Sequence, residues 1–167
     1  IYQEVERVRN IPLEKQEMLS PEVPTFTVDA KKTRDYDDAF SVMEWSSGGL
    51  VIAVHITDLS DFVYPQDALF KEAEARISSV YSLEESIPMI PDELSSDTFS
   101  LKAGEDRKVL SFMFQLSANG TWNLLEVVPR VIRVQKNLSY EEADHLIEEK
   151  RDFWGLLNKF CQRSLEQ

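Results

Sequence analysis

Two pairs of strand-like segments, each joined by a turn that contains glycine, place the strongest constraint on the fold. Residues 110–117 alternate between large apolar side chains and mostly smaller or polar ones, and an Asn-Gly pair follows at 119–120. Asn-Gly favours a tight β-hairpin because both turn positions need positive φ. The return strand is predicted over 121–134, with a bend near Pro129. A second hairpin is predicted within 39–57, around Ser-Ser-Gly-Gly, so the sheet should be mostly antiparallel.

Helical patterns flank these hairpins. Residues 66–77 repeat apolar side chains at helical spacing. Ser139 and Glu142 form a capping box for a helix that ends near Glu149. A last helix is expected from about Asp152, and its apolar face would need a partner, either a second copy of the chain or a further part of the polypeptide. That face consists of Phe153, Leu157, Phe160 and Leu165.

The remaining segments complete an α+β arrangement, a mostly antiparallel β-sheet flanked by helices. A short strand is predicted over 25–29, rich in β-branched and aromatic residues. Residues 78–101 are predicted to form a long loop in which 92–94 make one helical turn. Such a long loop in a compact domain often serves function. Residues 1–24 are predicted to be a lead-in or interdomain linker, and 25–167 to be one domain.

Composition narrows the class of protein. The chain has 167 residues, of which 43% are hydrophobic, which is enough for one domain with a buried core. Its net charge of −12 argues against a surface that binds nucleic acid over its whole extent. The single cysteine, Cys161, excludes an intrachain disulfide, and we expect a reducing, cytoplasmic compartment. No segment resembles a membrane span, so no membrane partner is expected.

Four aspartates within ten positions form the most unusual polar feature. Asp29 ends the strand-like run, and Asp35, Asp37 and Asp38 follow in the pattern Asp-x-Asp-Asp. Carboxylates packed this closely repel one another unless a positive charge lies between them. Mg²⁺ is a suitable cation because it prefers carboxylate oxygens and retains water at its other positions. Two such ions could clamp the attacking and leaving oxygens of a phosphodiester.

Other interpretations of this cluster stay open from the residues alone. An aspartate-rich turn is often only a solvated turn. A calcium loop of the EF-hand type fits poorly because the required glycine and terminal glutamate are absent at the right offsets. A glycosidase pair of carboxyl groups is conceivable, but any two acids could be nominated. Farther along, we interpret His55 as a core histidine with satisfied hydrogen bonds and Asp58 as a turn cap.

Several motifs, in order and spacing, resemble the catalytic RNB domain of the ribonuclease II family. Residues 26–29 (Phe-Thr-Val-Asp) and 34–39 (Arg-Asp-Tyr-Asp-Asp-Ala) resemble its signature. The later matching segments are 54–60 (Val-His-Ile-Thr-Asp-Leu-Ser), 79–81 (Ser-Val-Tyr), 87–91 (Ile-Pro-Met-Ile-Pro), 93–95 (Glu-Leu-Ser) and 100–101 (Ser-Leu). The resemblance covers residues 25–145, so 25–167 would be the N-terminal portion of such a domain.

This resemblance implies a hydrolytic 3′→5′ exoribonuclease that degrades single-stranded RNA to 5′-mononucleotides with Mg²⁺, or with Mn²⁺ as the alternative. It places the metal ligands at Asp29, Asp35, Asp37 and Asp38, with Asp29 and Asp38 on a substrate-orienting ion. Asp37, with Asp35, would serve the second ion and the attacking water, and Asp37 would be the most sensitive position. Tyr81 matches a tyrosine that stacks on a base; from the residues alone it could equally be an ordinary loop aromatic.

The chain also departs from the family pattern. A complete RNB domain is longer, and its second half brings an arginine, an acidic residue and a further stacking aromatic that this chain lacks. The chain begins with Ile1 rather than Met, which suggests a piece of something longer. We therefore expect the isolated chain to be weakly active or inactive. The alternative is a catalytically silent RNB-like module that binds RNA or protein.

Overall fold

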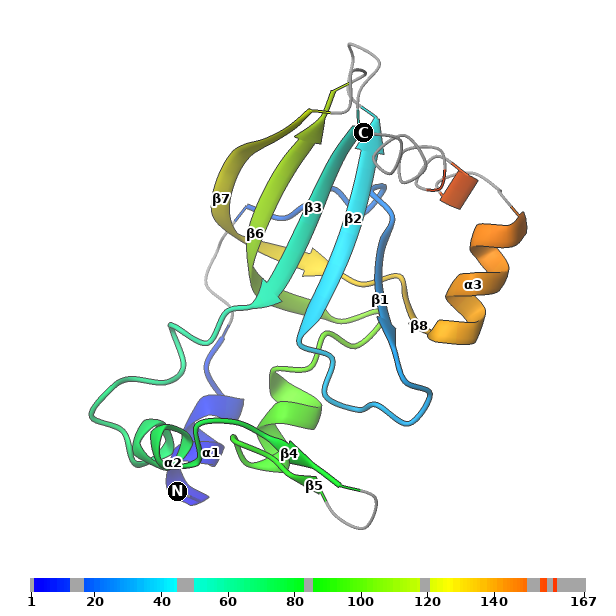
Figure 1. Cartoon of the computed structure of the whole chain (residues 1–167). Helices are drawn as coiled ribbons and strands as arrows, with labels where there is room; N and C mark the ends of the chain where they lie inside the picture. The colour runs from blue at the N-terminus through cyan, green and yellow to red at the C-terminus, as the bar shows by residue number, and fades with distance from the viewer. Residues whose placement is uncertain are drawn as a thin grey trace.

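Six strands form one sheet in the spatial order β7-β6-β3-β2-β1-β8 (Figure 1). The computed structural model describes residues 2–12, 17–44, 50–82, 86–117, 121–149, 154–155 and 158. The strands of this sheet are β1 (Thr25–Asp29), β2 (Asp38–Glu44), β3 (Leu50–Thr57), β6 (Asp106–Leu116), β7 (Trp122–Arg133) and β8 (Lys136–Ser139). β1 and β8 pair in parallel, and the other neighbours in this sheet pair antiparallel. The predicted α+β class with a mostly antiparallel sheet is therefore confirmed.

Both predicted hairpins are present as paired strands, β2 with β3 and β6 with β7. Their tight turns, at 45–49 and 118–120, lie outside the described residues. The register of β7 breaks opposite Met113 and Phe114, whereas Pro129 keeps regular pairing with Leu110. Val131 binds residues 17–19 through its backbone. Pro129, two residues earlier, faces the same edge, where its missing N–H leaves no donor unpaired.

A second group of elements lies at one end of the sheet (Figure 1). It contains α1 (Tyr2–Arg9), α2 (Ala68–Arg76), the two short strands β4 (Val80–Tyr81) and β5 (Ser86–Ile87), and the π-helix η1 (Leu94–Thr98). The helix predicted over 66–77 is confirmed as α2. The single turn predicted at 92–94 is too short, because η1 continues it to Thr98. The predicted lead-in contains α1, which the sequence patterns did not indicate.

The apolar face of α1 explains why this segment is helical. Val5 and Val8 are buried together with Leu69 of α2 and with Leu94 and Phe99 of the η1 segment. An isolated helix of eight residues is unstable in water, so this shared core must hold α1 in place. The same core fixes the position of η1 against the end of the sheet.

The helix α3 (Tyr140–Glu149) lies beside β1 and β8 and begins at the predicted capping box. The Glu142 N–H donates to Ser139 Oγ over 3.2 Å, and the Ser139 N–H donates to Glu142 Oε2 over 2.9 Å. Beyond α3, Trp154 is buried against Leu138 and Ala143. The apolar residues named for the last helix lie outside the described residues. Within the described part of the chain, no helix is both long and apolar enough to cross a membrane.

Candidate active site

The four aspartates lie along the connection between β1 and β2. Asp29 is the last residue of β1, Asp38 is the first residue of β2, and Asp35 and Asp37 lie on the connection between them. β1 pairs with β2 through its first two residues and with β8 through residues 26–29. The two strands therefore separate toward Asp29, and the connection spans this opening.

Two hydroxyl side chains from distant parts of the sequence fix the backbone of this connection. The Tyr36 N–H donates to Ser100 Oγ over 3.1 Å, and the Ser100 hydroxyl donates to the Arg34 carbonyl over 2.8 Å. At the end of β3, the Thr57 N–H donates to the Asp37 carbonyl over 3.0 Å. The Thr57 hydroxyl lies within hydrogen-bond distance of that carbonyl, at 3.2 Å, and of the Phe99 carbonyl, at 3.1 Å. The backbone is thus fixed on both sides of the acidic residues.

Asp29 has the least favourable surroundings of the four carboxylates. Its Oδ2 atom is buried and has no hydrogen-bond partner among the described residues. Burial raises the pKa of Asp29, the hydroxyl of Thr27 opposes this, and Asp38, Asp37 and Asp35 raise the pKa further. Three other carboxylates are therefore close enough to disfavour its charged form.

Asp38 is also shifted toward its neutral form. It lies at the surface, but the protein that covers one side of its carboxyl raises its pKa, and the charge of Asp37 adds to the effect. Two carboxylates in this state gain from a cation, because its positive charge offsets both the cost of burial and the repulsion that raise their pKa values.

These residues fit a hard divalent cation by their chemistry. All four supply carboxylate oxygens, and Asp29 Oδ2 is a buried acceptor without a donor. In the described part of the chain, however, no three acidic, histidine or cysteine side chains meet in an arrangement that could already hold a metal ion. Binding would therefore require side chains on the connection to converge.

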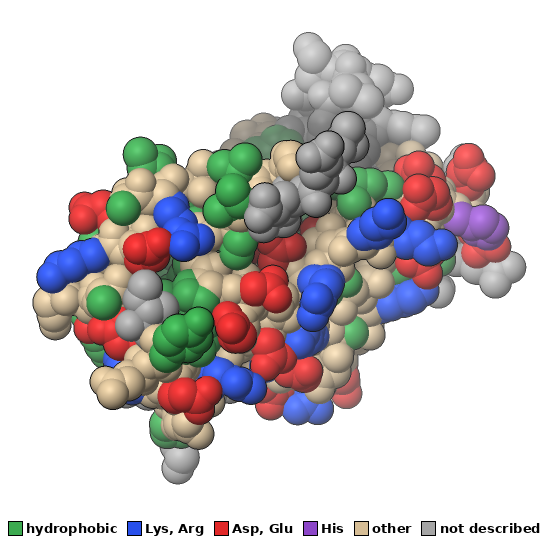
Figure 2. Space-filling model, turned by 90° about the horizontal axis from the view of Figure 1, so that it is seen from below, with side chains coloured by type: hydrophobic (Ala, Val, Ile, Leu, Met, Phe, Trp, Pro, Cys, Tyr) green, Lys and Arg blue, Asp and Glu red, His purple; other side chains and the backbone are tan. Residues whose placement is uncertain are grey.

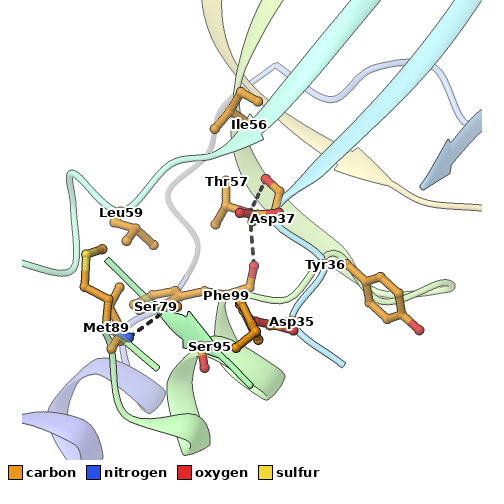
Figure 3. A pocket seen from close by; sticks show the side chains of 12 residues that line it. Asp35, Tyr36, Asp37, Ile56, Thr57, Leu59, Ser79, Met89, Ser95 and Phe99 are labelled. Carbon is orange, nitrogen blue, oxygen red and sulfur yellow. Dashed lines mark hydrogen bonds between the residues drawn. The ribbon is translucent and has the colours of Figure 1, made fainter. Parts of the chain in front are cut away.

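A cleft of about 240 Å³ lies beside the connection (Figure 3). Asp35 and Asp37 lie at it, whereas Asp29 and Asp38 are not among the residues that line it. Its other walls come from the end of β3 and from the segment 79–99, and they include Ile56, Leu59, Ser79, Met89, Ile90, Ser95 and Phe99. An acidic edge next to apolar walls is suited to a ligand that has both a charged group and a flat apolar one.

Tyr81 also lines this cleft and contacts the acidic cluster directly. Its hydroxyl donates to Asp35 Oδ2 over 2.5 Å, and this hydrogen bond is the main reason that the pKa of Tyr81 is raised. The side chain remains 66% exposed, so its ring is accessible from solvent. The structure therefore brings Asp35, Asp37 and Tyr81 to one cleft, with Asp29 and Asp38 beside it.

The surface around the cleft is mixed in charge. Figure 2 shows this end of the molecule from below, where acidic side chains gather across the middle of the face. Lysine and arginine side chains lie between and around them, and apolar side chains lie alongside. Such a face binds a polyanion only where cations or basic groups offset the acids.

His55 and Asp58 have the structural roles expected for them. His55 is fully buried, and its two ring nitrogens each lie 2.8 Å from a serine hydroxyl, those of Ser41 and Ser111. Asp58 Oδ1 accepts the N–H of Ser60 over 2.9 Å and so caps the turn. The carboxylate of Asp58 also pairs with the buried Lys108 at 3.3 Å. Burial raises the pKa of Asp58, but the hydrogen bonds from Ser60 and then the charge of Lys108 outweigh it and lower the pKa.

Sequence reasoning did not identify Thr57 or the hydroxyl of Ser100 as part of this site. Both lie in segments that carry the family resemblance, yet nothing in their local pattern indicates a contact with residues 20 or 64 positions away. Their contacts depend on how β3 and the η1 segment pack beside the connection.

Comparisons with known proteins find relatives of this chain. A sequence model of the RNB domain matches residues 19–156. Ribonuclease R of Chlamydia trachomatis is 36% identical over 126 residues, which cover 75% of this chain and 18% of that protein. A protein of Arabidopsis thaliana described as inactive exonuclease DIS3L2 is 36% identical over 155 residues, covering 84% of this chain and 14% of that protein.

The fold is also similar to a solved structure. RNase R of Mycoplasma genitalium, in complex with ribose-methylated single-stranded RNA, matches with a TM-score of 0.78 and 21% sequence identity. The match covers 92% of this chain and 25% of that one, and this chain spans less than a fifth of the two curated relatives above. Because the family model matches most of the sequence, this chain belongs to the RNB domain family.

Proposed function

We propose that this chain supplies the metal-holding part of the active centre of a hydrolytic 3′→5′ exoribonuclease. The substrate would be single-stranded RNA, the products 5′-mononucleotides, and the cofactor Mg²⁺, with Mn²⁺ as the alternative. Family membership supports the reaction class, since relatives in the family are named as ribonucleases or exonucleases. The similar RNase R structure, which contains single-stranded RNA, supports the substrate.

The crowding around Asp29 is the observation on which the proposal depends. One of its carboxylate oxygens is buried without a donor among the described residues, and burial together with three further aspartates raises its pKa. Such an arrangement costs stability in the absence of a cation, because like charges in partly buried surroundings repel strongly. A role in binding divalent ions accounts for a cluster that the fold alone would not favour.

The aspartates would divide into two pairs. Asp29 and Asp38 would hold an ion that orients the substrate, and Asp37 with Asp35 would serve a second ion and orient the attacking water. A pair of divalent ions supplies stabilisation of the charge on the attacking and leaving oxygens of a phosphodiester. The protein's own contribution is to hold the carboxylates, and Thr57 and Ser100 do this through the backbone.

Tyr81 and the apolar walls of the cleft would bind the base at the scissile end. Base stacking on an aromatic ring tolerates every sequence, which suits an enzyme that must remove each nucleotide in turn. Tyr81 lies beside Asp35, so a base stacked on its ring would bring the adjoining phosphate toward the carboxylates. The net charge of −12 disfavours RNA affinity in this chain alone, so we expect it to shorten RNA slowly or not at all by itself.

The test uses 5′-labelled single-stranded RNA with Mg²⁺ and the longest natural polypeptide that carries this chain. We expect a ladder of products shortened from the 3′ end. Asp37→Asn should abolish the shortening while circular dichroism shows that the fold is kept. Asp144→Asn, on the exposed face of α3, is the matched control and should leave the ladder unchanged. An intact ladder with Asp37→Asn would contradict the proposal.

A second candidate function is a catalytically silent module that binds RNA or protein. The Arabidopsis thaliana relative described as an inactive exonuclease favours it, since it is as similar to this chain as the Chlamydia trachomatis enzyme is. In the same assay this candidate predicts RNA binding, measured by fluorescence anisotropy, with no shortening and with no effect of Mg²⁺. In either case we propose a cytoplasmic location.

A further inference from the structure

The buried hydroxyl of Ser100 forms hydrogen bonds directly with the connection between β1 and β2 that carries Asp35 and Asp37. Ser100 is 1% exposed and follows η1, far from the connection in sequence. Its Oγ accepts the Tyr36 N–H and its hydroxyl hydrogen is donated to the Arg34 carbonyl. These are the peptide groups on either side of Asp35, so one buried side chain determines the backbone conformation of that residue.

Neighbouring contacts hold Ser100 itself rigid. The Leu101 N–H donates to the Tyr36 carbonyl over 2.8 Å, which continues the same attachment by one residue. Arg107 Nε donates to the Ser100 carbonyl over 2.9 Å, and a second Arg107 nitrogen donates to the Asp97 carbonyl over 3.0 Å. The hydroxyl is therefore held by β6 and by the segment after η1.

The attachment also fixes Tyr36, the residue between the two aspartates. Tyr36 packs against the core formed by Leu101 and its neighbours, and it lines the cleft together with Asp35 and Asp37. Figure 3 shows the Tyr36 ring directed away from the other residues of the cleft. Since Tyr36 lies between Asp35 and Asp37, fixing its backbone and packing its ring limits the positions that the two carboxylates can take.

We propose that Ser100 is a positioning residue that sets the spacing of Asp35 and Asp37 for a divalent ion. The inference rests on the proposed function for its metal, but its structural part concerns this chain alone. Replacement by alanine removes both hydrogen bonds and leaves a partly buried N–H and carbonyl without partners. The connection would then sample other conformations, and the positions of the two carboxylates would no longer be fixed.

Ser96→Ala provides a matched control. Ser96 is also buried, at 5% exposure, and lies four residues earlier, within η1. Its hydroxyl donates to the Asp92 carbonyl over 2.6 Å, which is a contact within the helical segment. Its loss should cost similar stability without affecting residues 34–37. Comparison with Ser100→Ala therefore separates positioning of the aspartates from a general weakening of the fold.

The test is an NMR titration of this chain with Mg²⁺, preceded by amide hydrogen exchange in its absence. In Ser100→Ala we expect the Tyr36 amide to exchange about tenfold faster than in the unmodified chain, since one hydrogen bond is lost. The side-chain carboxyl carbon signals of Asp35 and Asp37 should shift, and Mg²⁺ should bind about tenfold more weakly. Ser96→Ala should keep all three properties within twofold of the unmodified chain.

The outcomes separate this inference from the proposed function. Equal Mg²⁺ affinity and equal Tyr36 exchange in the two variants would overturn the role of Ser100, even if the chain binds Mg²⁺ well. If the unmodified chain shows no Mg²⁺ binding, the proposed metal site is contradicted, and the exchange and carboxyl signals then decide the role of Ser100. Unchanged signals for Asp35 and Asp37 in Ser100→Ala would reject it in that case.

Discussion

Acid pH should destabilise this fold through His55, which lies at the centre of the sheet. The ring is fully buried, and its nitrogens lie 2.8 Å from the hydroxyls of Ser41 and Ser111. Burial, and secondarily the charge of Arg130, lowers the pKa of His55 from 6.5 to about 4. The folded protein therefore keeps this imidazole neutral in a range of pH where the unfolded chain would protonate it.

The sign of the effect follows from this difference. The unfolded chain binds a proton below about pH 6.5 and the folded chain only below about pH 4, so His55 favours unfolding as the pH falls between these values. At pH 4.5 the two pKa values give a loss of about 2.5 kcal/mol relative to pH 7.5, and at pH 5.5 a loss of about 1.4 kcal/mol. A loss of this size is a large fraction of the stability of a typical domain.

The assay is urea unfolding of the chain and of His55→Gln between pH 7.5 and 4.5. The variant will be less stable at neutral pH because it loses both serine contacts, so the readout is the pH dependence of the difference between the two proteins. Asp29 and Asp38, whose pKa values are raised, favour folding as the pH falls, but they do so in both proteins and cancel in this difference. The stability difference should shrink by about 2.5 kcal/mol across the range.

The second histidine of the chain provides the control. His145 lies on the exposed side of α3, and His145→Gln should retain the acid-dependent loss that His55→Gln lacks. A stability difference between the unmodified chain and His55→Gln that stays constant with pH would refute the reasoning. So would an NMR titration in which the His55 ring gains its proton near pH 6.5.

Three further tests, two of them with a control substitution, address other parts of the structure. Lys108→Met should cost about 2 kcal/mol of unfolding free energy in urea unfolding, because loss of the buried ammonium leaves the Asp58 carboxylate without its cation. As the control, Lys136→Met breaks an exposed ion pair and should cost under about 1 kcal/mol. Ser139→Ala should lower the free energy of unfolding in urea by about 1 kcal/mol, because α3 loses its N-terminal cap. An unchanged free energy of unfolding would show that the cap does not stabilise the chain. Tyr81→Ala should weaken single-stranded RNA binding by about 1–3 kcal/mol in an anisotropy titration, because the stacking ring is lost. Tyr81→Phe keeps the ring and should retain most of the affinity. An equal loss of affinity in both variants would exclude stacking as the main contribution of Tyr81.

Local patterns in the sequence predicted the parts of the fold that depend on local interactions. The capping box at Ser139 and Glu142 is an example, since both partners lie within one helical turn. The two hairpins and α2 were predicted for the same reason. The helix α1 was not predicted, because its stability comes from Val5 and Val8 packing against residues some 60 to 90 positions away.

The candidate site divides in the same way. The four aspartates could be named from their spacing, and Tyr81 from the resemblance to a known family. Their role as metal ligands stays a prediction. The contacts of Thr57 and Ser100 could not be predicted, because each joins the connection only after β3 and the η1 segment have packed beside it. The extension of the helical turn into η1 likewise depends on burial of Leu94 and Phe99 in a core shared with α1.

The most direct test of the central claim is a crystal of this protein soaked in Mn²⁺, with anomalous scattering recorded at the manganese absorption edge. Mn²⁺ accepts the same oxygen ligands as Mg²⁺ and can be located unambiguously by its signal. We predict an anomalous peak among the carboxylates of Asp29, Asp35, Asp37 and Asp38. In crystals of Asp37→Asn this peak should be lost or clearly reduced in height. A map with no peak at this cluster, or with peaks only at other acidic surfaces, would contradict the account.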